Sequence, residues 1–187
     1  SAKSHITSIT GTDISLSATA GVYTISATST VLTGAGKLAV GDLITVSGSA
    51  SNNSTFTVNT VVSTTELTVA EVITSENADG SSTITLDHVG FVSDKAKGDG
   101  YYSQPDGVHT VAYQVANDFN ADATIKMQGT LATTPTEDDW FDISGTTFTS
   151  DTSTLTSSFN FTGNYVWVRS KTQLLTAGTT NSILLNS

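Results

Sequence analysis

The sequence predicts an all-β protein, and three observations support that prediction. Serine and threonine make up 60 of the 187 residues, and the branched β-carbon of threonine disfavours helix and suits a pleated strand. Valine, isoleucine and leucine alternate with polar residues over short stretches, which is the period of a half-buried strand. Turn clusters rich in glycine and asparagine separate these stretches. Disorder is the alternative for so polar a chain, but a disordered chain would not need the alternation.

The first half of the chain is expected to form a small β-barrel or β-sandwich. Its strand-like stretches are residues 22–26, 43–46, 55–61, 66–69 and 83–86. Turn signals lie between them at 51–54 and 77–80. The polar, glycine-containing stretch 93–100 has no periodicity, so we place a domain boundary there. The predicted domains are therefore residues 1–94 and 95–187.

The second half is expected to be a jelly-roll-like β-sandwich. It holds both tryptophans, and its strand-like stretches are residues 108–115, 123–131, 140–143, 159–169 with a turn at 162–164, and 182–186. Several strands anchored by aromatic residues are typical of that architecture. Pro135–Trp140 is the only helix candidate. Thr134 would cap this short turn and Pro135 would occupy its first position.

Charge and composition exclude several classes of protein. The formal net charge is −10, and the densest basic groups are the pairs Lys95/Lys97 and Arg169/Lys171. Binding to nucleic acid through its phosphates is therefore not expected. The absence of cysteine excludes disulfides and thiolate sites, and it is compatible with folding in a cytoplasm. No apolar run approaches the ~18 residues of a membrane span, so no membrane association is expected.

Two parts of the chain resemble phage proteins. Residues 41–49 followed by 52–58 resemble a small β module common in phage structural proteins. Residues 98–187 resemble a virion structural protein of marine contractile-tailed bacteriophages, including cyanophages. The motifs that carry this second resemblance are residues 100–102, 106–111, 129–141, 161–169 and 181–186. It implies a β-sandwich module displayed on the particle, and no catalytic motif accompanies it.

The resemblance leads us to expect a non-enzymatic virion protein that folds in the host cytoplasm and resides on the virion surface. The leading form is a capsid decoration or cement protein that contacts the major capsid protein and copies of itself, with a trimer as the preferred oligomer. One alternative is a neck, baseplate or tail-fibre attachment protein that contacts neck or tail subunits. Another is a glycan-binding receptor-recognition module. No cofactor is expected.

Two groups of residues are candidates for a site. Glu137, Asp138 and Asp139 could supply oxygen ligands to Ca²⁺, or they could be a solvated acidic turn beside a buried Trp140. The adjacent pair Tyr101 and Tyr102 could contact a glycan or a partner protein. In an extended chain the two rings would face opposite ways, which leaves one of them exposed.

Nothing in the sequence marks an enzyme. His5, His88 and His109 are not at a metal-ligand spacing, so a structural role is expected for each. The sequence has no nucleophile elbow, phosphate loop or His-Glu-x-x-His motif. Acidic residues are abundant, but no pair is marked out as the two carboxylates of a glycosidase.

Overall fold

The computed structural model describes residues 2–103, 107–120, 122–150 and 153–186. It confirms the all-β class, because the only helical elements in these ranges are two short 3-10 turns, η1 (Asp99–Tyr102) and η2 (Glu137–Asp139). Across the same ranges, no helix has the length and apolar character needed to span a membrane. The chain divides into a barrel unit, Ile6–Phe91, and a jelly-roll unit formed by Ser1–His5 and Val92–Ser187.

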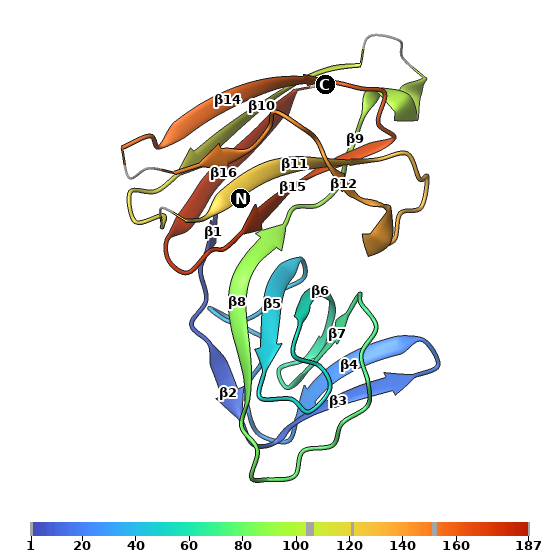
Figure 1. Cartoon of the computed structure of the whole chain (residues 1–187), viewed down its shortest axis with the longest axis vertical. Helices are drawn as coiled ribbons and strands as arrows, with labels where there is room; N and C mark the ends of the chain where they lie inside the picture. The colour runs from blue at the N-terminus through green and yellow to red at the C-terminus, as the bar shows by residue number, and fades with distance from the viewer. Residues whose placement is uncertain (1, 104–106, 121, 151–152, 187) are drawn as a thin grey trace. The chain divides into compact units, whose positions relative to one another are not determined.

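The jelly-roll unit is built from antiparallel strands in two sheets (Figure 1). Its strands are β1 (Lys3–Ser4), β9 (Ala96–Lys97), β10 (Val108–Val115), β11 (Thr124–Thr130), β12 (Phe141–Asp142), β13 (Phe148–Thr149), β14 (Thr156–Thr162), β15 (Trp167–Gln173) and β16 (Thr179–Asn186). One sheet has the order β1-β16-β10-β14. The other has β9-β15-β11, with β12 and β13 both paired to β11.

This strand order is that of a jelly roll. If β12 and β13 are taken as one interrupted strand, the first sheet holds the first, eighth, third and sixth strands of the unit. The second sheet then holds the second, seventh, fourth and fifth, which is the arrangement produced by two Greek keys. Tyr113 of β10 links the two layers. Its ring lies 6.1 Å from that of Phe148 in β13, and its hydroxyl donates to the carbonyl of Thr146 at 2.9 Å.

The barrel unit is one curled antiparallel sheet around a single apolar core. Its strands are β2 (Ile9–Gly11), β3 (Ile14–Thr19), β4 (Val22–Ala27), β5 (Asp42–Ser47), β6 (Thr55–Ser63), β7 (Glu66–Val69) and β8 (Ile84–Val92), the last residue of which belongs to the other unit. Their order is β2-β8-β5-β6-β7-β4-β3. Because β2 and β3 are consecutive in the chain yet lie at opposite ends of this order, the sheet must curl.

The domain limits differ from the predicted ranges 1–94 and 95–187. The units separate between Phe91 and Val92, and residues 1–5 belong with the jelly roll. The reason is that β1 pairs with β16, and the His5 amide donates to the carbonyl of Gly178 at 2.9 Å. The barrel is therefore inserted between the first two strands of the jelly roll. Its first and last strands, β2 and β8, pair with each other, as expected of an inserted domain whose ends lie close together.

Candidate functional site

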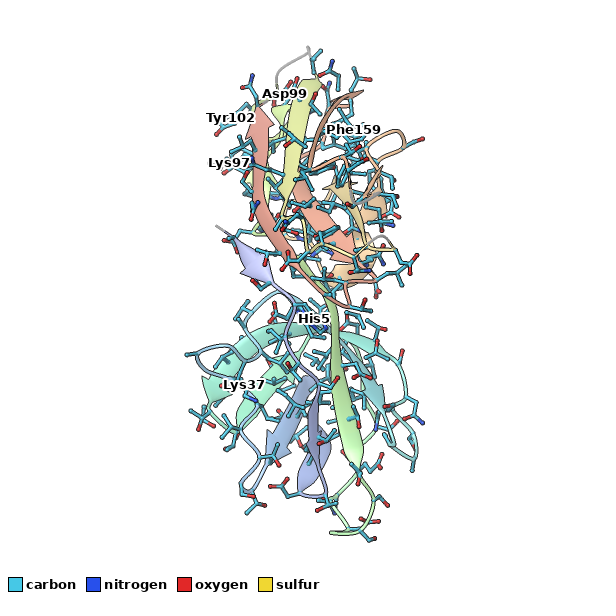
Figure 2. All side chains as sticks on the ribbon, turned by 90° about the vertical axis from the view of Figure 1, so that its left-hand side faces the viewer. His5, Lys37, Lys97, Asp99, Tyr102 and Phe159 are labelled. Carbon is cyan, nitrogen blue, oxygen red and sulfur yellow. The ribbon has the colours of Figure 1, made fainter. Side chains whose placement is uncertain are left out.

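An aromatic and cationic cluster surrounds Trp167, the first residue of β15. The Tyr101 ring centroid lies 4.9 Å from that of Trp167 and 5.2 Å from that of Tyr102, in an edge-on arrangement with Tyr102. The Lys95 ammonium lies 4.4 Å from the centre of the Trp167 ring, and that of Lys97 lies 4.1 Å from the centre of Tyr101. Lys97 is also 5.5 Å from the Tyr102 ring (Figure 2). We call these five residues the Trp167 cluster.

The position of the cluster depends on a loop that joins β14 to β15. The amides of Gly98 and Gly100 donate to the carbonyls of Val166 and Tyr165 at 3.0 and 2.9 Å, so η1 is held against this loop. A Cβ added at Gly100 would lie 2.4 Å from a backbone carbonyl oxygen of the loop, which leaves no room for a side chain. Glycine is therefore required for the close approach that places Tyr101 beside Trp167.

Arg169 is a buried residue that lies on the same side of β15 as Trp167 and binds several partners. Its guanidinium makes two hydrogen bonds to the Glu137 carboxylate at 2.8 and 2.6 Å and one from Nε to Gln128 at 2.9 Å. The guanidinium carbon also lies 4.2 Å from the centre of the Trp140 ring. The bidentate geometry fixes η2 and its flanking loop against the sheet.

Five of the seven basic residues gather on the outer face of this sheet. Trp167, Arg169 and Lys171 alternate along β15 with the buried residues Val168, Ser170 and Thr172. Lys97 lies opposite Trp167 in β9, and Lys126 lies opposite Lys171 in β11. Lys95 completes the set through its contact with the Trp167 ring. The strand register therefore joins the two basic pairs that are separate in the sequence.

The basic residues at one end of this face have carboxylate partners, and, within the described ranges, those at the other end do not. Lys126 forms an ion pair with Asp142, whose pKa is raised by burial but lowered more by hydrogen bonds from Lys126 and Gln128, so it lies below its usual value. Burial, followed by the charges of Arg169 and Lys126, lowers the pKa of Lys171. At the other end, Lys95 and Lys97 have no carboxylate partner among the residues that the structure describes.

Tyr101 and Tyr102 do not face opposite ways, because they belong to the 3-10 turn η1 rather than to extended chain. Both rings are exposed, at 43% and 59% of their full surface. The structure thus brings the predicted pair together with Trp167, Lys95 and Lys97. An alternating Trp-x-Arg-x-Lys pattern at 167–171 was the sequence signal for part of this face.

Two of the three predicted calcium ligands, Glu137 and Asp139, have protein partners, and Asp138 is exposed. Glu137 is held by Arg169, and Asp139 accepts hydrogen bonds from the Thr136 amide and hydroxyl at 2.7 and 2.8 Å. These bonds lower the pKa of Asp139. Across the described ranges, no group of three histidine or acidic side chains is placed to hold a metal ion. The turn is capped by Thr136 rather than by Thr134, and Trp140 is only partly buried, with its ring against the Arg169 guanidinium.

The three histidines lie in different surroundings. His109 in β10 is buried, stacks on Phe161 at 4.8 Å, and pairs through Nε2 with the carbonyl of Gly163 at 3.1 Å. His88 is in the barrel unit, with its Nε2 3.7 Å from Asp42, and its Nδ1 accepts from the Ile6 amide. His5 belongs to the jelly-roll unit. Phe161, on which His109 stacks, is also buried.

The outer face of the other jelly-roll sheet has the opposite character. The strands β10, β14 and β16 contain no Asp, Glu, Lys or Arg. Their register places these side chains on the outer face: Val108, Thr110, Ala112, Gln114, Thr156, Ser158, Asn160, Thr162, Ser182, Leu184 and Asn186. We call this set the uncharged face. In the described chain β14 pairs with β10 alone, so it forms an edge of the sheet.

No protein-family model matches the chain, and a search of curated proteins finds no significant match.

Proposed function

We propose that this chain is a non-enzymatic structural protein of a phage particle, specifically a capsid decoration protein at the virion surface. Its partners are the major capsid protein and copies of itself. The observation that carries the proposal is the uncharged face of β10, β14 and β16. The resemblance of residues 98–187 to virion structural proteins supplies the phage context.

An uncharged polar sheet face suits permanent association. Burying an unpaired charge costs far more than burying a hydroxyl or amide that finds a hydrogen-bond partner. On this face such groups already pair across strands, as Thr110 does with Asn160 at 2.9 Å. Leu184, which is 65% exposed and lies opposite Ala112 of β10, adds apolar area to the face. The edge strand β14 offers backbone groups to which a partner strand can add.

The surroundings of the titratable groups agree with a role in association. Glu137 and Asp139 are engaged in folding contacts, and His88 and His109 are buried. General acid–base catalysis needs a titratable group within hydrogen-bond reach of a substrate, which a buried histidine does not offer. A neck, baseplate or tail-fibre position would use the same uncharged face, so copy number separates the two roles.

The test is to quantify the protein in purified particles by mass spectrometry. A decoration protein on a symmetric shell is expected in hundreds of copies per particle. A small number of copies would overturn decoration in favour of a neck or tail position, and absence from particles would overturn a virion role altogether.

A pair of variants tests the surface itself. Leu184→Lys places a charge on the uncharged face and should abolish self-association or particle binding, measured by light scattering and co-sedimentation. Leu174→Lys is the matched control, because Leu174 is 61% exposed and lies outside that face. Equal effects of the two variants would contradict the assignment of this face.

A further inference from the structure

We propose that the Trp167 cluster binds an acidic polysaccharide, a sugar chain that bears uronate or sulfate groups. The inference is independent of the position of the protein on a particle. It rests on the exposed rings of Tyr101 and Tyr102 and on the lysines that lie against them. It sharpens the glycan-binding alternative by naming the charge of the ligand.

The distribution of charge distinguishes the surface around the Trp167 cluster. The whole chain carries −10, yet five of its seven basic residues share one sheet face. The barrel unit holds one lysine, Lys37, against seven acidic residues. The negative net charge of the chain repels anions in general, but this sheet face is locally rich in basic residues. Of the five cations, Lys95 and Lys97 are the exposed pair that lacks a carboxylate partner in the described chain.

The two tyrosine rings are set at an angle to each other. Tyr101 and Tyr102 meet at an interplanar angle of 74°, so their rings point in nearly perpendicular directions. A pyranose ring presents C–H groups that pack on an aromatic face, and rigid tyrosine rings provide that area at little cost in conformational entropy. Tyr102, the more exposed of the two at 59%, offers the free surface.

The position of Lys97 favours an acidic sugar over a neutral one. Lys97 lies within 5.5 Å of the ring centres of both tyrosines. A neutral sugar on these rings would displace the ammonium from its cation–π contacts without replacing them. A uronate or sulfate group would instead pair with the ammonium while its sugar ring packs on Tyr102. Lys95, two residues before Lys97, would lie about 6.6 Å further along an extended chain and can take a second anionic group.

Nucleic acid is the less suitable polyanion. Its affinity comes from neutralising many phosphates, and a chain with a net charge of −10 offers few cations for that purpose. A partner of the aromatic rings needs a face that can stack, which sugars and nucleobases both have. A polyanion without rings, such as polyglutamate, would use the lysines alone and therefore serves as a control for charge.

The experiment measures binding of the whole chain to alginate, a polyuronate, and to dextran sulfate, with neutral dextran as the uncharged control. We expect binding to at least one of the acidic polymers and none to neutral dextran. Lys97→Ala and Tyr102→Ala should each weaken it at least tenfold, whereas Tyr102→Phe retains it within about threefold, because the ring remains. Lys37→Ala in the barrel unit is the matched control and should change binding less than twofold. Thermal unfolding verifies that each variant is folded.

Three results would overturn the proposal. The first is no binding to either acidic polysaccharide. The second is an equal loss in Lys37→Ala and Lys97→Ala, which would assign binding to overall charge. The third is binding to polyglutamate or single-stranded DNA of the same strength, together with no effect of Tyr102→Ala. That outcome would favour an acidic protein or a nucleic acid as the partner.

Discussion

Replacing Arg169 should destabilise the jelly-roll unit, because it removes the ion pair between Arg169 and Glu137. The Arg169 side chain is 6% exposed and the Glu137 side chain is 25% exposed. Removing one partner of a buried ion pair costs about 3–5 kcal/mol, because the other charge remains buried. In Arg169→Met the residual charge is on Glu137, which can regain some water, so we expect a loss of about 3 kcal/mol. Glu137→Gln leaves the more buried guanidinium without its anion and should cost at least as much.

Urea unfolding followed by tryptophan fluorescence measures this effect. Both tryptophans lie in the jelly-roll unit, so the signal reports that unit without the barrel. The double variant Arg169→Met/Glu137→Gln should cost less than the sum of the single variants by at least about 1.5 kcal/mol, since the two side chains form one network. Lys126→Met, which removes a more exposed pair, should cost under about 1 kcal/mol. Additive single variants, or an Arg169→Met cost below that of Lys126→Met, would refute the reasoning.

Three further predictions concern the barrel unit and its insertion. Gly48→Ala, at a φ of +80° with the new Cβ 2.1 Å from a backbone oxygen, should cost more than about 3 kcal/mol in circular-dichroism unfolding, whereas the unobstructed Gly80→Ala should cost about 1 kcal/mol. Hydrogen bonds to Glu76, chiefly from the Ser49 hydroxyl, lower the pKa of its carboxyl group in the folded barrel. Ionised Glu76 therefore adds to the stability of the barrel above its unfolded pKa of about 4.3, and this stability is lost as the pH falls through the lower folded pKa. Glu76→Gln should therefore flatten the decline of barrel stability below that pH, and an unchanged acid profile would contradict this. Replacement of residues 6–91 by a short Gly/Ser linker should leave the fluorescence and cooperative unfolding of the jelly roll intact; an unfolded product would argue against a true insertion.

The parts of the fold that were predictable from the sequence are those set by local alternation. The predicted strand 108–115 has the limits of β10, and the predicted turn at 162–164 lies where β14 ends and β15 begins. The two-residue strand β1 has no period to detect, and only its pairing with β16 gives it a place. The inserted barrel was missed for that reason, because the insertion is defined by contacts between the two ends of the chain.

The site was predictable only in its separate pieces. Tyr101 and Tyr102 were selected as adjacent aromatics of which one would be exposed, yet their conformation depends on the glycines that hold η1 against the loop before β15. Trp140 was expected to be buried beside a solvated acidic turn. The structure instead stacks it on the charge of Arg169, a contact that sequence spacing does not encode. Long-range register decides such contacts, and a single sequence does not carry it.

The two proposed surfaces belong to different sheets of one sandwich. Because the sheets of a sandwich pack through their inner faces, their outer faces point in opposite directions. The uncharged face lies on the sheet of β10, β14 and β16, and the Trp167 cluster lies against the sheet of β15. A copy bound to a particle through the first surface would therefore present the second to solvent. The two proposals together predict that particle-bound protein still binds an acidic polysaccharide, and that Leu184→Lys releases the protein from the particle without weakening its affinity for the sugar.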